Sequence, residues 1–149
     1  MISKKKYTKY TTDGETLKAA DDDDAANVIL GGNWQLPTKE IWVALYGANK
    51  DKVYWGPNNG DETLETISGI QGMKITKIDD SKTYIFLPAA GYVNGTKFQE
   101  VGSIFYYWSG TASSDGAYDL NFWNSYVSAG DSDYRHFGFS VRPVRLVEE

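Results

Sequence analysis

The side chains with the greatest capacity for chemistry lie close together near the end of the chain. His136 is the only histidine, and Asp131 and Asp133 shortly precede it. A histidine beside a carboxylate can act as a general base, but hydrolases of this kind also need a serine or cysteine nucleophile on a defined turn. The chain has no cysteine, and no serine stands in such a motif. We therefore predict that the protein is not an enzyme.

A run of four aspartates, Asp21–Asp24, raises the question of metal binding. Calcium sites space their ligands along a loop, whereas adjacent carboxylates on a helix point in different directions. The Leu, Lys and Ala residues around the run favour a helix, so we expect a first helix within Gly14–Asn27 that carries the aspartates on a solvated face. No metal ion and no cofactor is predicted.

Composition excludes further classes of function. The formal net charge is −5 at pH 7, and the only basic run lies at the start, in residues 3–9. Because nucleic-acid binding depends on clustered Lys and Arg, we expect no nucleic-acid partner. No apolar stretch approaches the roughly 20 residues that span a bilayer, and no signal-peptide pattern opens the chain, so we expect no direct membrane insertion. The length predicts one domain, which we place over 14–149 after an N-terminal tail over 1–13.

The elements that must position these side chains are two helices followed by strands. In NWQLPTKEIWVALYG, Thr38 can cap a helix whose Ile41, Trp42 and Leu45 recur at helical spacing and which Gly47 ends. The segments MKITKI and TYIFLPA alternate around a turn and predict a β-hairpin, and NG in GYVNGTKF predicts a second one. This order predicts the α+β class, with a mainly antiparallel sheet.

The last third of the chain has the composition of a recognition surface. Lys, Glu, Gln and Met are absent from Val101–Val147, whereas they occur 24 times in the other 102 residues. Ser103–Phe137 contains five Tyr, three Phe and two Trp among seven Ser. Recognition surfaces lose Lys and Glu and gain Tyr and Trp with short polar neighbours. Aromatic residues also enrich strands and cores, so composition alone leaves both interpretations open.

Periodicity favours the surface. With Leu120 and Phe122 facing the core, strand alternation sends Asp119, Asn121 and Trp123 to the opposite face. A tryptophan exposed beside polar residues is typical of a partner site.

The closing segment GFSVRPVR is the strand expected to hold this surface. Phe139 and Val141 point inward in this prediction, which leaves residues 131–137 as a loop. The side chains that the loop presents are Tyr134, His136 and Phe137.

Several motifs, in this order, resemble a known family. NWQLPTKEIW, FLPAAGYVNGT, VGS, YYWSGT and GFSVRPVR are similar to C-type-lectin-fold domains of the formylglycine-generating-enzyme group. More narrowly, they resemble the variable proteins of diversity-generating retroelements and related bacterial surface proteins. The resemblance covers roughly residues 21–146 and implies a short, loop-rich C-type-lectin-like fold.

The resemblance also implies a function, that of a receptor-recognition domain with a protein or glycan ligand. In the variable proteins, adenine-directed mutagenesis diversifies the C-terminal segment, commonly at asparagine codons, and this cannot produce Lys, Glu, Gln or Met. The depletion agrees with that rule, while Trp123 departs from it. The cysteines of the formylglycine-generating enzyme are missing. A location on a cell surface or phage particle, or secretion, is implied.

Carried over by position, the candidate ligand-binding residues are Ile104, Phe105, Tyr106, Asp119, Asn121, Trp123, Tyr126, Ser128, Asp131, Asp133, Tyr134, His136 and Phe137. The scaffold implied by the same resemblance comprises Trp34, Leu36, Pro37, Trp108, Leu120, Phe122, Gly138, Phe139, Val141 and Pro143.

Two alternatives stay open beside diversified recognition. Calcium-dependent sugar binding is not expected, because the chain has WNS where calcium lectins have WND and lacks their acidic loop. A fixed-specificity adhesin could still bind a glycan by stacking on Trp123 or Tyr126. A structural surface subunit, such as a pilus component, could instead use the aromatic face for assembly.

Overall fold

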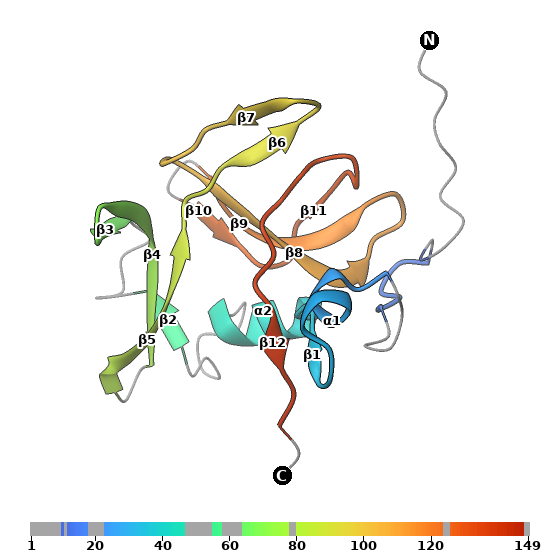
Figure 1. Cartoon of the computed structure of the whole chain (residues 1–149), viewed down its shortest axis with the longest axis horizontal. Helices are drawn as coiled ribbons and strands as arrows, with labels where there is room; N and C mark the ends of the chain where they lie inside the picture. Colours follow the sequence, from blue (N-terminus) through green and yellow to red (C-terminus); the bar gives the residue numbers. More distant parts are fainter. Residues whose placement is uncertain are drawn as a thin grey trace.

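The computed structural model describes residues 10, 12–17, 23–46, 55–57, 64–77, 80–123 and 126–147. These residues form two short helices and a series of strands in small, mostly antiparallel sheets (Figure 1). The predicted α+β class is confirmed. The helices are α1 (Ala25–Leu30) and α2 (Lys39–Tyr46). The strands are β1 (Trp34–Gln35), β2 (Trp55–Pro57), β3 (Glu65–Ile67), β4 (Ile70–Lys77), β5 (Asp80–Pro88), β6 (Tyr92–Asn94), β7 (Lys97–Gln99), β8 (Phe105–Ala112), β9 (Ala117–Trp123), β10 (Tyr126–Ser128), β11 (Ser132–Asp133) and β12 (Val144–Arg145).

Helix α2 forms where it was predicted. Thr38 Oγ1 accepts a hydrogen bond from the backbone N–H of Ile41 at 3.3 Å, which satisfies one of the unpaired donors of the first turn. Trp42 is 1% exposed, and its ring lies edge-on to Tyr107 of β8. The helix therefore packs its apolar stripe on the central strands. Gly47, predicted to end the helix, lies outside the described residues.

The first helix lies later in the chain than predicted. The prediction placed it within Gly14–Asn27, but α1 begins at Ala25, and Thr16 forms an isolated antiparallel bridge with Thr111 of β8. Residues 14–17 thus join a sheet edge, because β8 offers backbone groups there that local helix propensity does not outweigh. Neither helix in the described part of the chain is long and apolar enough to cross a membrane.

Asp24 corrects the prediction of a solvated aspartate run. It is 1% exposed, and its Oδ1 accepts hydrogen bonds from the N–H groups of Ala26 and Asn27, which caps α1. Both carboxylate oxygens also accept from the N–H of Leu36, at 2.9 and 3.2 Å. The carboxylate therefore joins the start of α1 to the chain beyond β1. Asp21 and Asp22 lie outside the described residues.

Both predicted hairpins are present. Strand β4 pairs with β5, and Met73, Ile75 and Leu87 on this pair are fully buried. Strands β2 and β3 pair with β4 on its other edge. The second hairpin joins β6 to β7 and stands at the top of Figure 1; its turn places Gly95 at φ 63°, a conformation that suits glycine.

The central sheet is built around β9. Strand β8 pairs along one edge of β9, while β10 and β11 pair with successive parts of the other edge. Its core face carries Phe105, Tyr107, Leu120, Phe122 and Val127. These side chains pack with α2 and with the β4–β5 hairpin in one hydrophobic core.

The closing segment holds three parts of the fold together. Gly138 exchanges two backbone hydrogen bonds with Val93 of β6. Ser140 is hydrogen-bonded through its N–H and C=O to the backbone of β8, and β12 pairs with β1. Val141, predicted to point inward, is 40% exposed, because residues 141–143 lie between the Ser140 bridge and β12 rather than in a strand of either sheet.

We expect Phe122→Ala to lower the free energy of unfolding by about 3–5 kcal/mol, because it removes a buried ring from a packed core. The matched control is Trp123→Ala, one residue further along β9. Because this side chain is exposed, its removal should change the free energy of unfolding by no more than about 0.5 kcal/mol. Urea denaturation of both variants measures the difference. Equal losses in the two variants would contradict the assignment of faces.

Candidate functional site

The pairing register places most of the predicted ligand-binding residues on one face of the central sheet. Residues paired across antiparallel strands carry their side chains on the same face. Asn121 pairs with Tyr106 of β8 and Ser128 of β10, and Trp123 pairs with Tyr126. This face is opposite the one that packs in the core.

The same face continues toward β11. Asp133 pairs with Ala117, and the N–H of Asp119 donates to the C=O of Asp131 at 3.1 Å. The pairing of β11 with β9 brings the backbone of Asp133 close to Gly116. A Cβ atom at Gly116 would lie only 2.2 Å from the C=O oxygen of Asp133. Trp108, which pairs with Asp119, lies on the same side of the sheet. We call the predicted site residues on this side the outer face; they are Tyr106, Asp119, Asn121, Trp123, Tyr126, Ser128, Asp131 and Asp133.

Two predicted site residues do not reach the outer face. Ile104 and Phe105 are 6% and 0% exposed, so the prediction that they meet a ligand beside Tyr106 is wrong about their position. Phe105 pairs with Phe122 on the core face. Strand alternation allows only one of two neighbouring residues to face outward, and here it is Tyr106.

Three further candidates lie on the outer face but are covered. Asp119, Asn121 and Ser128 are 0%, 6% and 8% exposed, which corrects their predicted exposure. Their short side chains bond locally: Asn121 Nδ2 donates to Asp119 Oδ1 at 2.8 Å, and the N–H of Gly130 donates to Ser128 Oγ at 3.3 Å. They form a polar floor to the outer face rather than its contact surface.

The exposed aromatic residues are placed as predicted. Trp123 and Tyr126 are 56% and 62% exposed on the paired ends of β9 and β10. Tyr134 is 57% exposed, and its ring stacks with that of the exposed His136, 5.8 Å between centroids. Among the described residues, no hydrogen bond joins His136 to Asp131 or Asp133.

A cluster of rings supports the loop that carries Tyr134 and His136. Phe139 stacks on Trp108 at 4.2 Å and on Tyr106 at 4.4 Å. Phe137 is half-buried, parallel to Phe139 and edge-on to Tyr92 of β6. Phe137 is thus mainly a support of the loop. Sequence reasoning missed Tyr92, which lies far from the loop along the chain.

The acidic end of the outer face has unusual electrostatics. Burial, partly offset by the hydrogen bond from Asn121 and reinforced by Asp133 and Asp131, raises the pKa of Asp119 to about 8. Burial and then Asp131 raise the pKa of Asp133 as well. Asp119 Oδ2 is buried without a hydrogen-bond partner. Among the described residues, no group of three His, Asp or Glu side chains is arranged to hold a metal ion.

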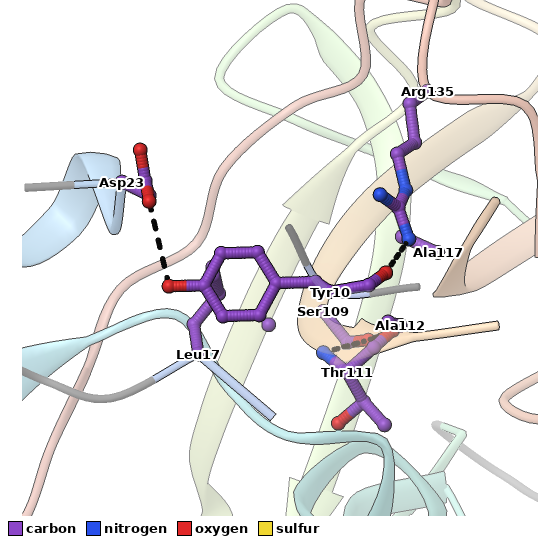
Figure 2. Close-up of a pocket in the computed structure, with 9 residues that line it drawn as sticks. Tyr10, Leu17, Asp23, Ser109, Thr111, Ala112, Ala117 and Arg135 are labelled. Atoms are coloured by element: carbon purple, nitrogen blue, oxygen red, sulfur yellow. Dashed lines mark hydrogen bonds between the residues drawn. The ribbon is translucent and has the colours of Figure 1, made fainter. Parts of the chain in front are cut away.

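A hollow of about 270 Å³ lies between the N-terminal segment and the irregular part of β8, around Ser109–Thr111 (Figure 2). The Arg135 guanidinium crosses it and donates to the C=O groups of Gly116, at 2.7 Å, and of Tyr10. Asp13 accepts a hydrogen bond from the hydroxyl of Tyr118 at 2.8 Å. Residues predicted to belong to a tail over 1–13 therefore contact the domain and anchor its loop.

Arg135 is a positioning residue that sequence reasoning missed. The available signal was its isolation, because it is the only Lys or Arg between Val101 and Val141. Its neighbours Tyr134 and His136 are exposed, while its own side chain is half-buried and directed toward the N-terminal segment.

We expect Asp119→Asn to stabilise the protein increasingly as the pH rises from 5 to 8. The folded-state pKa of about 8 lies above the ordinary aspartate pKa of 3.8, so the folded protein holds a proton that the unfolded chain releases. The stability that depends on this proton is present at low pH and is lost as the pH rises through 8. The amide keeps the acceptor for Asn121 and has no charge to bury.

Thermal unfolding at both pH values measures the effect, with a gain of at least about 2 °C expected at pH 8. Asp115→Asn, which removes an exposed carboxylate from the turn before β9, is the control. A gain of the same size at pH 5 and pH 8 would contradict the proton bound at Asp119.

Comparisons with known proteins do not assign this chain to a family. No protein-family model, no curated protein and no solved structure matches this chain. Function is therefore inferred from the residues and their arrangement.

Proposed function

We propose that the chain is a non-catalytic ligand-binding domain with a C-type-lectin-like fold, of the kind found in the variable proteins of diversity-generating retroelements. The observation that carries this proposal is the register of β9. Leu120 and Phe122 pack in the core, whereas Asp119, Asn121 and Trp123 face outward in alternation with them. The positions expected to vary thus fall mainly where a change of side chain leaves the hydrophobic core intact.

Rigid support of the outer face favours recognition. Trp123, Tyr126 and Tyr134 offer large exposed rings on strands and on a loop braced by Phe137 and Phe139. Tyr and Trp give a large contact area at little conformational cost, and binding energy concentrates in such residues. Display of this face to partners outside a cell or on a phage particle belongs to the same proposal.

A fixed-specificity adhesin is the second candidate. Trp123 and Tyr126 are exposed side by side on paired strands, an arrangement on which the apolar face of a sugar can stack. In that case the outer face would be constant among copies of the protein. An assembly subunit that uses the same rings for self-association is a weaker variant of this candidate.

The DNA that flanks the gene distinguishes diversified from constant recognition. We expect a near-copy of the codons for residues 103–142 that differs only at adenines, together with a reverse-transcriptase gene. Differences should concentrate at codons of the outer face and spare those of Leu120 and Phe122. The codons for residues 64–100 are the internal control and should have no near-copy. Absence of any such repeat would favour the fixed-specificity adhesin.

We also expect the outer face to tolerate substitution. One library randomises Trp123, Tyr126, Tyr134 and His136, and a matched library randomises Phe105, Tyr107, Leu120 and Phe122. The fraction of displayed variants that resists protease should be at least about tenfold higher in the first library, because exposed changes seldom cost more than about 0.5 kcal/mol. Similar fractions in the two libraries would contradict a scaffold that accepts a changing surface.

A further inference from the structure

The outer face has two ends of different chemistry. Trp123 and Tyr126 form an aromatic end, where both rings are more than half exposed. At the opposite end of β9, Asp131 and Asp133 lie beside Asp119 and Ala117. The ends are six residues apart along β9, or about 20 Å at the rise of an extended strand. The buried, polar Asn121 and Ser128 lie between them.

The acidic end carries two neighbouring carboxyl groups, Asp131 and Asp133. Asp131 is exposed and Asp133 half-buried, and each raises the pKa of Asp119 beside them. Arg135 directs its guanidinium to the C=O groups of Gly116 and Tyr10, in the hollow of Figure 2. The carboxylates therefore offer acceptors to a cation supplied from outside.

A second observation points to a ligand at the same end. Asp119 is 0% exposed and shares the outer face with Asp131 and Asp133, yet its Oδ2 has no hydrogen-bond partner. A buried carboxyl oxygen without a hydrogen-bond partner is rare in folded proteins. The described acidic groups are not spaced to enclose a metal ion. A longer cation with several donors, such as an ammonium or a guanidinium, can instead bridge separated carboxylates.

We propose that the outer face binds an extended protein segment that places Lys or Arg side chains at Asp131 and Asp133 and apolar side chains against Trp123 and Tyr126. This inference rests on the proposed function and names the partner of the same site. About six extended residues match the length of the face. Charge at one end sets the direction of the segment, and the aromatic rings supply contact area at the other.

Two blocked peptides that differ only in charge test this partner, Lys-Lys-Ser-Ser-Trp-Trp and Glu-Glu-Ser-Ser-Trp-Trp. Fluorescence anisotropy with labelled peptides, in about 0.15 M salt to screen distant charges, measures Kd. The acidic-end variant carries Asp131→Asn and Asp133→Asn. The control carries Glu40→Gln and Asp80→Asn, which remove the same charge from exposed positions on α2 and at the start of β5.

We expect the wild type to bind the lysine peptide at least about tenfold more tightly than the glutamate peptide. The preference should fall below about threefold in the acidic-end variant and persist in the control, and Trp123→Ala should weaken both peptides. An equal loss of preference in the two double variants would show a long-range charge effect and overturn the inference. So would a lysine peptide that fails to bind the wild type at about 1 mM, or tighter binding of maltohexaose.

Failure of this inference is distinguishable from failure of the proposed function. The template repeat and the tolerance of the outer face to substitution do not depend on its charge. A face that is diversified but ignores the lysine peptide would leave the proposed function intact and exclude a cationic segment as its partner.

Discussion

The pairing of β9 with three strands is the constraint on which the rest of the structure depends. With β8 on one edge and β10 and β11 on the other, every residue of β9 has a fixed face. A shift by one residue would exchange Leu120 and Phe122 for Asp119 and Asn121 in the core. The cost of burying those polar groups there holds the register, and the register in turn decides which side chains a partner can meet.

The outer face is braced by aromatic rings and also carries a buried carboxyl group close to two others. Rings from β6, β8 and the closing segment, packed edge-on or stacked, brace the loop that carries Tyr134 and His136. Asp119 lies buried near two other carboxylates, so the same strand that orders the surface also carries a group that favours protonation. Buried groups of this kind are costly to keep ionised, and strongly perturbed carboxyl groups cluster at functional sites.

The sequence predicted what depends on neighbours in the chain. The cap at Thr38, the apolar stripe of α2 and the turn at Gly95 are local patterns, and the structure contains them. Positions that depend on distant partners were missed. Asp24 is buried because Leu36 and the start of α1 supply three donors, and Asp119 is covered although alternation predicted the correct face. For Phe105, motif position was carried over without applying the strand period, whereas Ile104 lies just before β8, where that period does not apply. Which of these side chains are exposed therefore depends on the tertiary structure and could not be predicted from local sequence patterns.

The closing segment also determines when the outer face can exist during synthesis. Residues 138–145 bond to β6, β8 and β1, all of which leave the ribosome earlier. Until these residues emerge, the rings of Tyr106 and Trp108 lack Phe139, and β1 lacks its only partner strand among the described residues. A nascent chain stopped before this point would display adhesive aromatic surface without a finished fold. Shortened translation products are thus candidates for aggregation or proteolysis, whereas the complete domain covers these rings with the closing segment.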